Sequence, residues 1–236
     1  MSEADREKGE VSGRQDPAFV KGAFSRIADR YVLTNHVLSA GADILWRKKV
    51  GRVVAGWDPL KILDVATGTG DLALELQRKC KNADVLGTDF CEEMLAHAKK
   101  RGLRETMVAD ALNLPFGDGR FDLVTVAFGL RNMACWEAGL REMTRVVRRG
   151  GHVAVLDFSL PRGMLRQPYL FYLNKVLPKI AGVITREHDA YEYLAGSIGQ
   201  FPSGDEMLSL FEKVGMKEVS CRRMSGGIAS IYVGQV

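Results

Sequence analysis

The spacing of apolar positions changes near residue 56. Before that point, apolar side chains such as Phe19, Ile27 and Tyr31 recur at multiples of four, as on one face of a helix. This spacing predicts N-terminal helices over residues 17–56. The polar and charged residues 1–16 that precede them are expected to form a disordered tail.

Beyond residue 56, short apolar runs alternate with amphipathic segments. The runs that read as buried strands cover residues 61–66, 84–89, 105–110, 121–128 and 151–158, and helical patterns cover 71–78, 91–100 and 135–147. Strands that alternate with helices at this spacing are typical of a parallel, doubly wound sheet. We therefore predict an α/β fold.

The C-terminal third departs from this alternation. Residues 161–200 form an apolar and aromatic insertion with basic residues spaced through it, which we interpret as a helical lid over a substrate. A helix over 203–215 and strands over 217–224 and 227–236 follow, and Ser-Gly-Gly joins the two strands. This turn predicts an antiparallel hairpin at the sheet edge. Residues 17–236 would then form one Rossmann-like domain with a mostly parallel, seven-stranded sheet.

Composition narrows the function classes. The chain has 236 residues, 26% of them charged, and a net charge of +4, without a dense basic block, so nucleic-acid binding is not expected. Its four cysteines form no C-x-x-C pair, which argues against zinc and against a disulfide framework. The sequence has neither a signal-peptide pattern nor an apolar run of the ~20 residues that a spanning helix needs. We expect a cytoplasmic protein, at most one that lies on the inner membrane face.

The first chemical signal is the stretch LDVATGTGDLALEL at residues 63–76. A strand ends there, the backbone turns on Gly68 and Gly70, and a helix begins with unpaired N–H groups. The next strand ends in Asp89, whose carboxylate could accept both hydroxyls of a ribose. These features predict a nucleoside-containing cofactor.

Two cofactors fit the glycine spacing. GTGDLA also matches G-x-G-x-x-G/A, the fingerprint of nicotinamide dinucleotides. However, Asp64 and Asp71 flank the turn, where a pyrophosphate would be repelled. Asp110 closes the third strand at a position that suits an adenine amino group. Acidic residues at three successive strand ends favour a cationic nucleoside, S-adenosylmethionine.

The sequence resembles the class I S-adenosylmethionine-dependent methyltransferases, and within them the C-methyltransferases of ubiquinone and menaquinone biosynthesis. The resemblance runs from about Phe19 to the C-terminus and rests on FSRIADRYVLTNHVLSAG, DVATGTGD, ALNLPF, FGLRN, LDFS, YEYLAGSIGQFP and GGI. It implies methylation of a ring carbon of a prenylated hydroquinone. The substrate would be demethylmenaquinol, the 2-methoxy-6-polyprenyl-1,4-benzoquinol of ubiquinone biosynthesis, or both.

The resemblance also implies a cofactor site. Thr69 matches the threonine whose turn holds the methionine moiety, Asp89 the ribose carboxylate, and Asp110 with Ala111 the adenine contacts. Ala127 stands where some relatives have a serine that contacts the cofactor. We expect the cofactor to contact Asp64, Thr67, Gly68, Thr69, Gly70, Asp89, Phe90, Asp110, Ala111 and Ala127.

Catalysis would centre on the strand end in VTVAFGLRNM, residues 124–133. Arg131 and Asn132 follow the fourth strand at the edge where open α/β sheets bind ligands. A guanidinium there can stabilise a developing phenolate, but it stays protonated at any physiological pH and is therefore a poor base. Tyr31 and Asp157 are candidates to share a proton relay. A salt bridge from Arg131 to Asp157 or Asp189 stays open as a structural alternative.

Substrate-binding candidates and alternative functions complete the prediction. Asp189, Tyr191 and Phe201 are candidates to line the quinol pocket. Contact with a membrane surface and pairing with a second copy are both compatible with the apolar insertion. The alternatives are a methyltransferase for another small molecule, a nicotinamide oxidoreductase, for which no Y-x-x-x-K device is found, and a non-catalytic cofactor-binding module.

Overall fold

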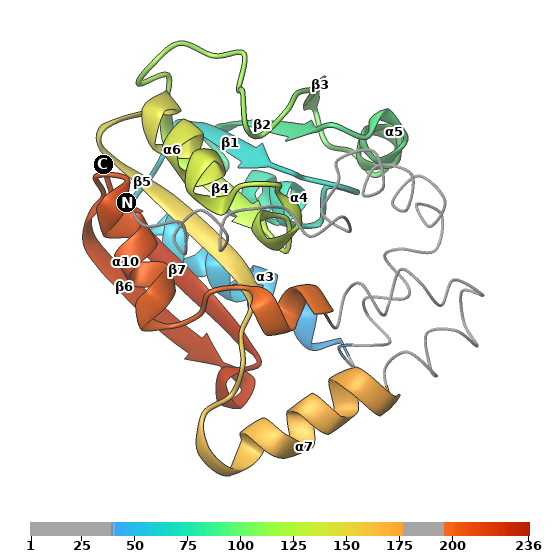
Figure 1. Cartoon of the computed structure of the whole chain (residues 1–236). Coiled ribbons are helices and arrows are strands. Elements are labelled where there is room, and N and C mark those ends of the chain that lie inside the picture. The colour runs from blue at the N-terminus through green and yellow to red at the C-terminus, as the bar shows by residue number, and fades with distance from the viewer. Residues whose placement is uncertain (1–38, 40, 177–195) are drawn as a thin grey trace.

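The computed structural model describes residue 39 and residues 41–176 and 196–236. The expected tail over 1–16, most of the expected N-terminal helices, and Tyr31, Asp189 and Tyr191 lie outside these residues. The described residues carry one mixed sheet with helices on both faces (Figure 1).

The sheet has seven strands in the order β3-β2-β1-β4-β5-β7-β6. The strands are β1 (Lys61–Val65), β2 (Asp84–Asp89), β3 (Glu105–Val108), β4 (Phe121–Ala127), β5 (Val147–Phe158), β6 (Lys217–Met224) and β7 (Ala229–Gln235). The strands β1 to β5 pair in parallel, whereas β7 pairs antiparallel with both β5 and β6. The predicted doubly wound sheet with a C-terminal hairpin is confirmed. The hairpin turn is the short helix η4 (Ser225–Gly227).

Alternate residues of the central strands face two separate hydrophobic cores. One core packs β1, β4 and β5 against α6 (Trp136–Val146) and α10 (Asp205–Lys213). The other packs them against α3 (Ala42–Ala55) and α4 (Asp71–Lys79), with Ala98 of α5 (Glu92–Lys100). Ile62 and Leu63, for example, are fully buried in opposite layers. Successive strand side chains point to opposite faces, so both faces of β1 are covered.

The strand order reverses between β1 and β4. From β1 the chain moves outward to β2 and β3, then returns to the other side of β1 to form β4 and β5. The loops after β1 and β4 therefore diverge and leave a crevice at the carboxyl ends of these strands, where open α/β sheets bind ligands.

Several strand ends differ from the sequence prediction by one or more residues, and two of them have clear local causes. The third strand stops at Val108 rather than residue 110, because the Asp110 carboxylate accepts the Leu112 N–H and bends the chain. The fifth strand begins at Val147, four residues earlier than expected, and α6 ends just before it. Val147, the last residue of the expected helix, is β-branched and instead pairs with Phe121 as a strand residue.

The insertion begins with three short helices beyond the end of β5. These are η2 (Gly163–Leu165), α7 (Arg166–Phe171) and the π-helical η3 (Tyr172–Val176). Figure 1 shows α7 set apart from the helices that cover the sheet. The remainder of the insertion up to residue 195 lies outside the described residues, so its function as a lid stays a prediction.

Candidate active site

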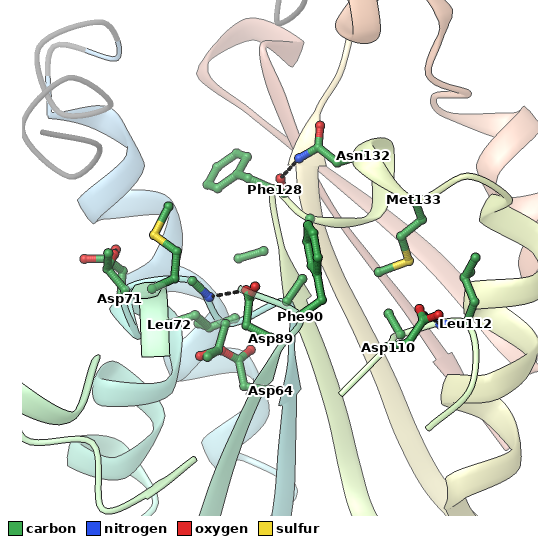
Figure 2. Close-up of a pocket in the computed structure, with 18 of the residues that line it drawn as sticks. Asp64, Asp71, Leu72, Asp89, Phe90, Asp110, Leu112, Phe128, Asn132 and Met133 are labelled. Atoms are coloured by element: carbon green, nitrogen blue, oxygen red, sulfur yellow. Dashed lines mark hydrogen bonds between the residues drawn. The ribbon is translucent and has the colours of Figure 1, made fainter. Parts of the chain in front are cut away.

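A cavity of about 230 Å³ occupies the crevice between β1 and β4. Its walls come from the β1–α4 turn, the ends of β2 and β4, the segment after β3, and α3. Figure 2 shows Asp64, Asp89 and Phe90 on one side and Phe128, Asn132 and Met133 on another. All ten residues that the sequence predicts for the cofactor, except Gly70, line this cavity.

The β1–α4 turn is shaped by left-handed backbone conformations. Ala66, Gly68 and Gly70 have φ values of 50°, 55° and 82°. A side chain on Gly70 would meet Ala98 Cβ at 3.0 Å, so glycine is needed there for both conformation and packing. Gly68 has no atom near its missing Cβ and lines the cavity. Its bare backbone therefore lets a ligand approach closely.

Asp64 lies beneath this turn and is almost fully buried. Its carboxylate accepts hydrogen bonds from the hydroxyls of Thr67 and Thr125, each at 2.6 Å. Burial raises its pKa from 3.8 to about 6, although the two hydroxyls and Arg47 favour the charged form. At neutral pH Asp64 therefore carries a negative charge that burial disfavours and that a bound cation would stabilise.

We expect Asp64→Asn to raise the free energy of unfolding at pH 8 in the absence of ligand. The pKa rises from 3.8 to about 6 on folding, so ionising Asp64 at pH 8 costs the folded state roughly 3 kcal/mol. This cost builds up as the pH rises through that window. In urea unfolding, the variant should have the higher free energy of unfolding at pH 8, and this difference should shrink toward zero near pH 4.

Asp122→Asn provides the matched control. Hydrogen bonds from Arg148 and from the backbone of Leu60 and Lys61 hold the pKa of Asp122 below its usual range, despite partial burial. Loss of this carboxylate should therefore destabilise the chain at pH 8, the opposite sign. A pH-independent difference for Asp64→Asn would contradict the assignment of a raised pKa.

Asp89 ends β2 and holds the glycine turn in place. Its two carboxylate oxygens accept the backbone N–H groups of Gly68, at 2.8 Å, and Cys91, at 3.0 Å. Burial raises its pKa, and these backbone hydrogen bonds counteract the rise. Since each oxygen has a second lone pair, the carboxylate can still accept hydroxyl groups of a ligand from the cavity.

Asp71 and Thr69 form the start of α4. The Thr69 hydroxyl donates to Asp71 at 2.7 Å, and Arg101 donates both to Asp71 and to the Thr69 carbonyl. Burial opposes the charged form of Asp71, but Arg47 and Arg101 outweigh it and hold the pKa below its usual range. Asp71 is therefore an ionised, already paired group at this end of the cavity.

The segment after β3 forms the opposite end of the cavity. Asp110, Ala111 and Leu112 line it, and Asp110 is exposed to solvent. The hydrogen bond from the Leu112 N–H to Asp110, at 2.8 Å, fixes this carboxylate beside the cavity. Phe90 adds an aromatic face nearby (Figure 2). A polar acceptor next to an aromatic ring suits a heterocyclic base.

The end of β4 is strained. Phe128 has a φ of 59°, which is unusual for a residue with a side chain, and it leaves the strand one residue earlier than predicted. Its carbonyl accepts hydrogen bonds from Arg131 Nη1, at 2.5 Å, and Asn132 Nδ2, at 3.2 Å. A Cβ on Gly129 would lie 2.6 Å from Ala66 Cβ. Close contact between the two strand ends and these hydrogen bonds maintain the strained conformation.

Arg131 forms a buried ion pair with Asp157. Arg131 Nη1 lies 2.9 Å from Asp157 Oδ1, and the two side chains are 5% and 0% exposed. The guanidinium also packs against the Phe158 ring, 5.1 Å from its centroid. Burial raises the pKa of Asp157, and Arg131 opposes the rise. The salt bridge that the sequence left open as an alternative is thus present, and Asn132, rather than Arg131, lines the cavity.

One predicted site residue, Phe201, does not line the cavity, and several residues that do line it were not predicted. Phe201 is 5% exposed and packs edge-on against Trp136 in the hydrophobic core, away from the cavity lining. Sequence reasoning missed Arg47 and several apolar lining residues, namely Leu72, Met94, Leu112 and Met133. The sequence feature that could have pointed to Arg47 is its position next to Trp46 on a predicted helix. Among the described residues, no cluster of three His, Cys, Asp or Glu side chains could hold a metal ion.

Comparison with known proteins decides the family. Residues 10–236 match the model of the ubiE/COQ5 methyltransferase family. The chain belongs to this family. A demethylmenaquinone methyltransferase of Thermus thermophilus is 43% identical over 89% of this chain and 98% of its own length. A ubiquinone/menaquinone biosynthesis C-methyltransferase of Bdellovibrio bacteriovorus is 40% identical over 94% and 97%.

Solved structures agree with this family at the level of the fold. A structure from Thermotoga maritima, described as an S-adenosylmethionine-dependent methyltransferase, matches with a TM-score of 0.66 and 19% identity, over 91% of this chain and 98% of that one. A phosphoethanolamine N-methyltransferase of Haemonchus contortus, solved with S-adenosyl-L-methionine, matches with a TM-score of 0.57 and 14% identity, over 75% and 48%.

The cavity of this ubiE/COQ5 family member fits S-adenosylmethionine. Four carboxylates line it, those of Asp64, Asp71, Asp89 and Asp110, against one guanidinium, that of Arg47. This balance favours a ligand with positive charge, a ribose diol and an adenine amino group. It disfavours a pyrophosphate beside the turn, as the dinucleotide alternative requires.

Proposed function

We propose that this chain transfers a methyl group from S-adenosylmethionine to a ring carbon of a prenylated hydroquinone. The reaction class follows from the family: the chain is an S-adenosylmethionine-dependent C-methyltransferase of quinone biosynthesis. The observation that carries the site assignment is the carboxylate-lined cavity bounded by the Phe128–Ala134 loop. Demethylmenaquinol and the 2-methoxy-6-polyprenyl-1,4-benzoquinol are the two proposed substrates.

The chemistry requires alignment and proton removal but no oxidant or reductant. Bound S-adenosylmethionine supplies an electrophilic methyl group on a sulfonium. The ring carbon forms a new bond to this methyl, the electron pair of the broken S–C bond stays on sulfur, and the ring carbon then loses its proton. Ionisation of a ring hydroxyl increases electron density on that carbon, and the hydroxyl regains its proton afterwards. Net, one methyl group replaces one proton.

We propose that Arg131 acts chiefly as a positioning residue. Its ion pair with Asp157 and its hydrogen bond to the Phe128 carbonyl support the corner that the chain makes over residues 128–132, which forms part of the cavity wall. The corner presents Asn132, whose amide can hydrogen-bond a ring hydroxyl. Arg131 does not line the cavity, so its positive charge would favour a phenolate there only from behind Asn132. Tyr31, Asp189 and Tyr191 stay as predicted relay and substrate residues.

The quinone content of cells tests the proposed function. Cells that lack the gene should accumulate demethylmenaquinone, the demethylated ubiquinone precursor, or both, as measured by mass spectrometry. The wild-type gene on a plasmid should restore the methylated quinones. A normal quinone profile in the deletion strain would overturn the proposal.

We also propose that the start of the insertion contacts a membrane surface. Met164, Leu165 and Phe171 are 94%, 56% and 64% exposed, and the exposed cations Arg166 and Lys175 are interspersed with them along the segment. Exposed apolar side chains interspersed with cations suit an anionic bilayer, where the prenyl tail of the proposed substrate resides. In the described residues, no helix is long and apolar enough to span a membrane.

We expect Leu165→Glu/Phe171→Glu to reduce binding to vesicles that contain phosphatidylglycerol by more than about tenfold, because burying each apolar side chain contributes roughly 1.5–3 kcal/mol. Cosedimentation measures the bound fraction. Leu60→Glu, at an exposed position before β1, is the control and should leave binding unchanged. If the double variant binds vesicles normally but no longer self-associates in ultracentrifugation, this segment is part of a homodimer interface instead.

A further inference from the structure

Arg47 is the cation of the cavity. Among the described residues that line the cavity, it is the only lysine, arginine or histidine. It lies on α3 and is 7% exposed. Its guanidinium lies over the Phe128 ring, 5.1 Å from the centroid, and Phe128 itself lines the cavity. A buried cation at a ligand cavity is costly unless it is paired, so its partners are informative.

The position of Arg47 is fixed from two sides. The neighbouring Trp46 donates its indole N–H to the Ser225 hydroxyl at 2.9 Å and packs against Phe128 and Phe158, which holds α3 to the sheet. One turn earlier on α3, Asp43 accepts a hydrogen bond from Arg47 Nη1. In the described part of the chain, Asp43 is the hydrogen-bond partner of this guanidinium, and it occupies one of its two terminal nitrogens. Nη2 and Nε therefore remain as donors.

The charges near Arg47 identify which end of the cofactor it would meet. Arg47 favours the charged forms of both Asp64 and Asp71, so its guanidinium lies within range of the β1–α4 turn rather than of the Asp110 end. The amino-acid end of S-adenosylmethionine carries an ammonium and a carboxylate. Asp64 suits the ammonium, but no aspartate of the cavity can bind a carboxylate.

We propose that Arg47 binds the carboxylate of the cofactor's amino-acid end, with Asp43 as the residue that positions the guanidinium. This inference rests on the proposed function, because it assumes S-adenosylmethionine as the ligand. A guanidinium bonded to Asp43 through one terminal nitrogen can still donate hydrogen bonds to a second carboxylate. Arg47 then also balances the charge of the two aspartates at the turn.

Titration calorimetry with two ligands tests the proposal without a measurement of activity. S-Adenosylmethionine and decarboxylated S-adenosylmethionine differ only in the carboxylate. In Arg47→Gln, the Kd ratio of the decarboxylated to the intact ligand should fall by roughly 10- to 100-fold, the size of a lost charge-assisted hydrogen bond. Misfolded protein lowers the titration stoichiometry and leaves this ratio unaffected, so the variant remains informative.

Arg101→Gln is the matched control for long-range charge. Arg101 pairs with Asp71 but does not line the cavity, so its loss should change the ratio by less than about threefold. A ratio in Arg47→Gln equal to that of wild type, or a fall of the same size in Arg101→Gln, would overturn the proposal for Arg47. Failure of the wild-type chain to bind either ligand would instead overturn the proposed function.

Discussion

Arg131→Met should lower the free energy of unfolding by about 3–5 kcal/mol, because it leaves the buried Asp157 carboxylate without its cation. Methyl transfer should fall by at least ~100-fold, since the strained Phe128 corner loses a hydrogen bond and Asn132 shifts with it. Urea unfolding measures the first effect. An assay with a labelled methyl donor, run under conditions in which the variant is fully folded, measures the second.

A double variant separates stability from catalysis. Arg131→Met/Asp157→Leu removes both charges and should recover most of the lost stability but not the activity. Arg141→Met, in an exposed pair with Glu137, is the control and should cost less than ~1 kcal/mol. If the double variant regains activity with stability, Arg131 has only a structural function, and the assignment of the corner to catalysis is wrong.

Asp89→Asn should weaken S-adenosylmethionine binding by more than about 100-fold. The carboxylate accepts two backbone N–H groups that shape the glycine turn, and an amide nitrogen cannot replace either oxygen as an acceptor. The variant should therefore lose the proposed contact to the ribose and disturb the glycine turn, which forms part of the cavity wall. Titration calorimetry measures the loss of affinity.

Asp84→Asn offers the comparison within the same strand. Asp84 begins β2 at the opposite end from Asp89 and is exposed, so its substitution should leave affinity within about twofold of wild type. Equal affinities for wild type and Asp89→Asn would show that the cofactor does not bind at the carboxyl end of β2. The cavity would then need another ligand.

The sequence predicted the sheet and the acidic strand ends well, for local reasons. Strand periods, glycine turns and the Ser-Gly-Gly hairpin are encoded over a few residues, so their order determines a doubly wound sheet. Asp64 and Asp89 fall at carboxyl ends of neighbouring parallel strands. Any chain with this alternation must bring them together.

The partners of the charged side chains could not be predicted in the same way. Arg131 and Asp157 are 26 residues apart in sequence, and whether the guanidinium turns toward Asp157 or toward the cavity depends on packing by Phe128 and Phe158. Arg47 reaches the cavity because Trp46 anchors α3 to the sheet. Such arrangements depend on tertiary contacts that helical periodicity does not encode.

Transfer of a labelled methyl group by the purified protein tests the central claim most directly. The protein would be incubated with S-adenosylmethionine carrying a ¹³C methyl group and with short-chain demethylmenaquinone or the benzoquinone precursor, each in reduced and oxidised form. We predict that at least one reduced ring gains a single ¹³C methyl group on carbon, detected by mass spectrometry, and that the electron-poor oxidised forms gain none. Binding of the cofactor without label transfer to either quinol would contradict the account.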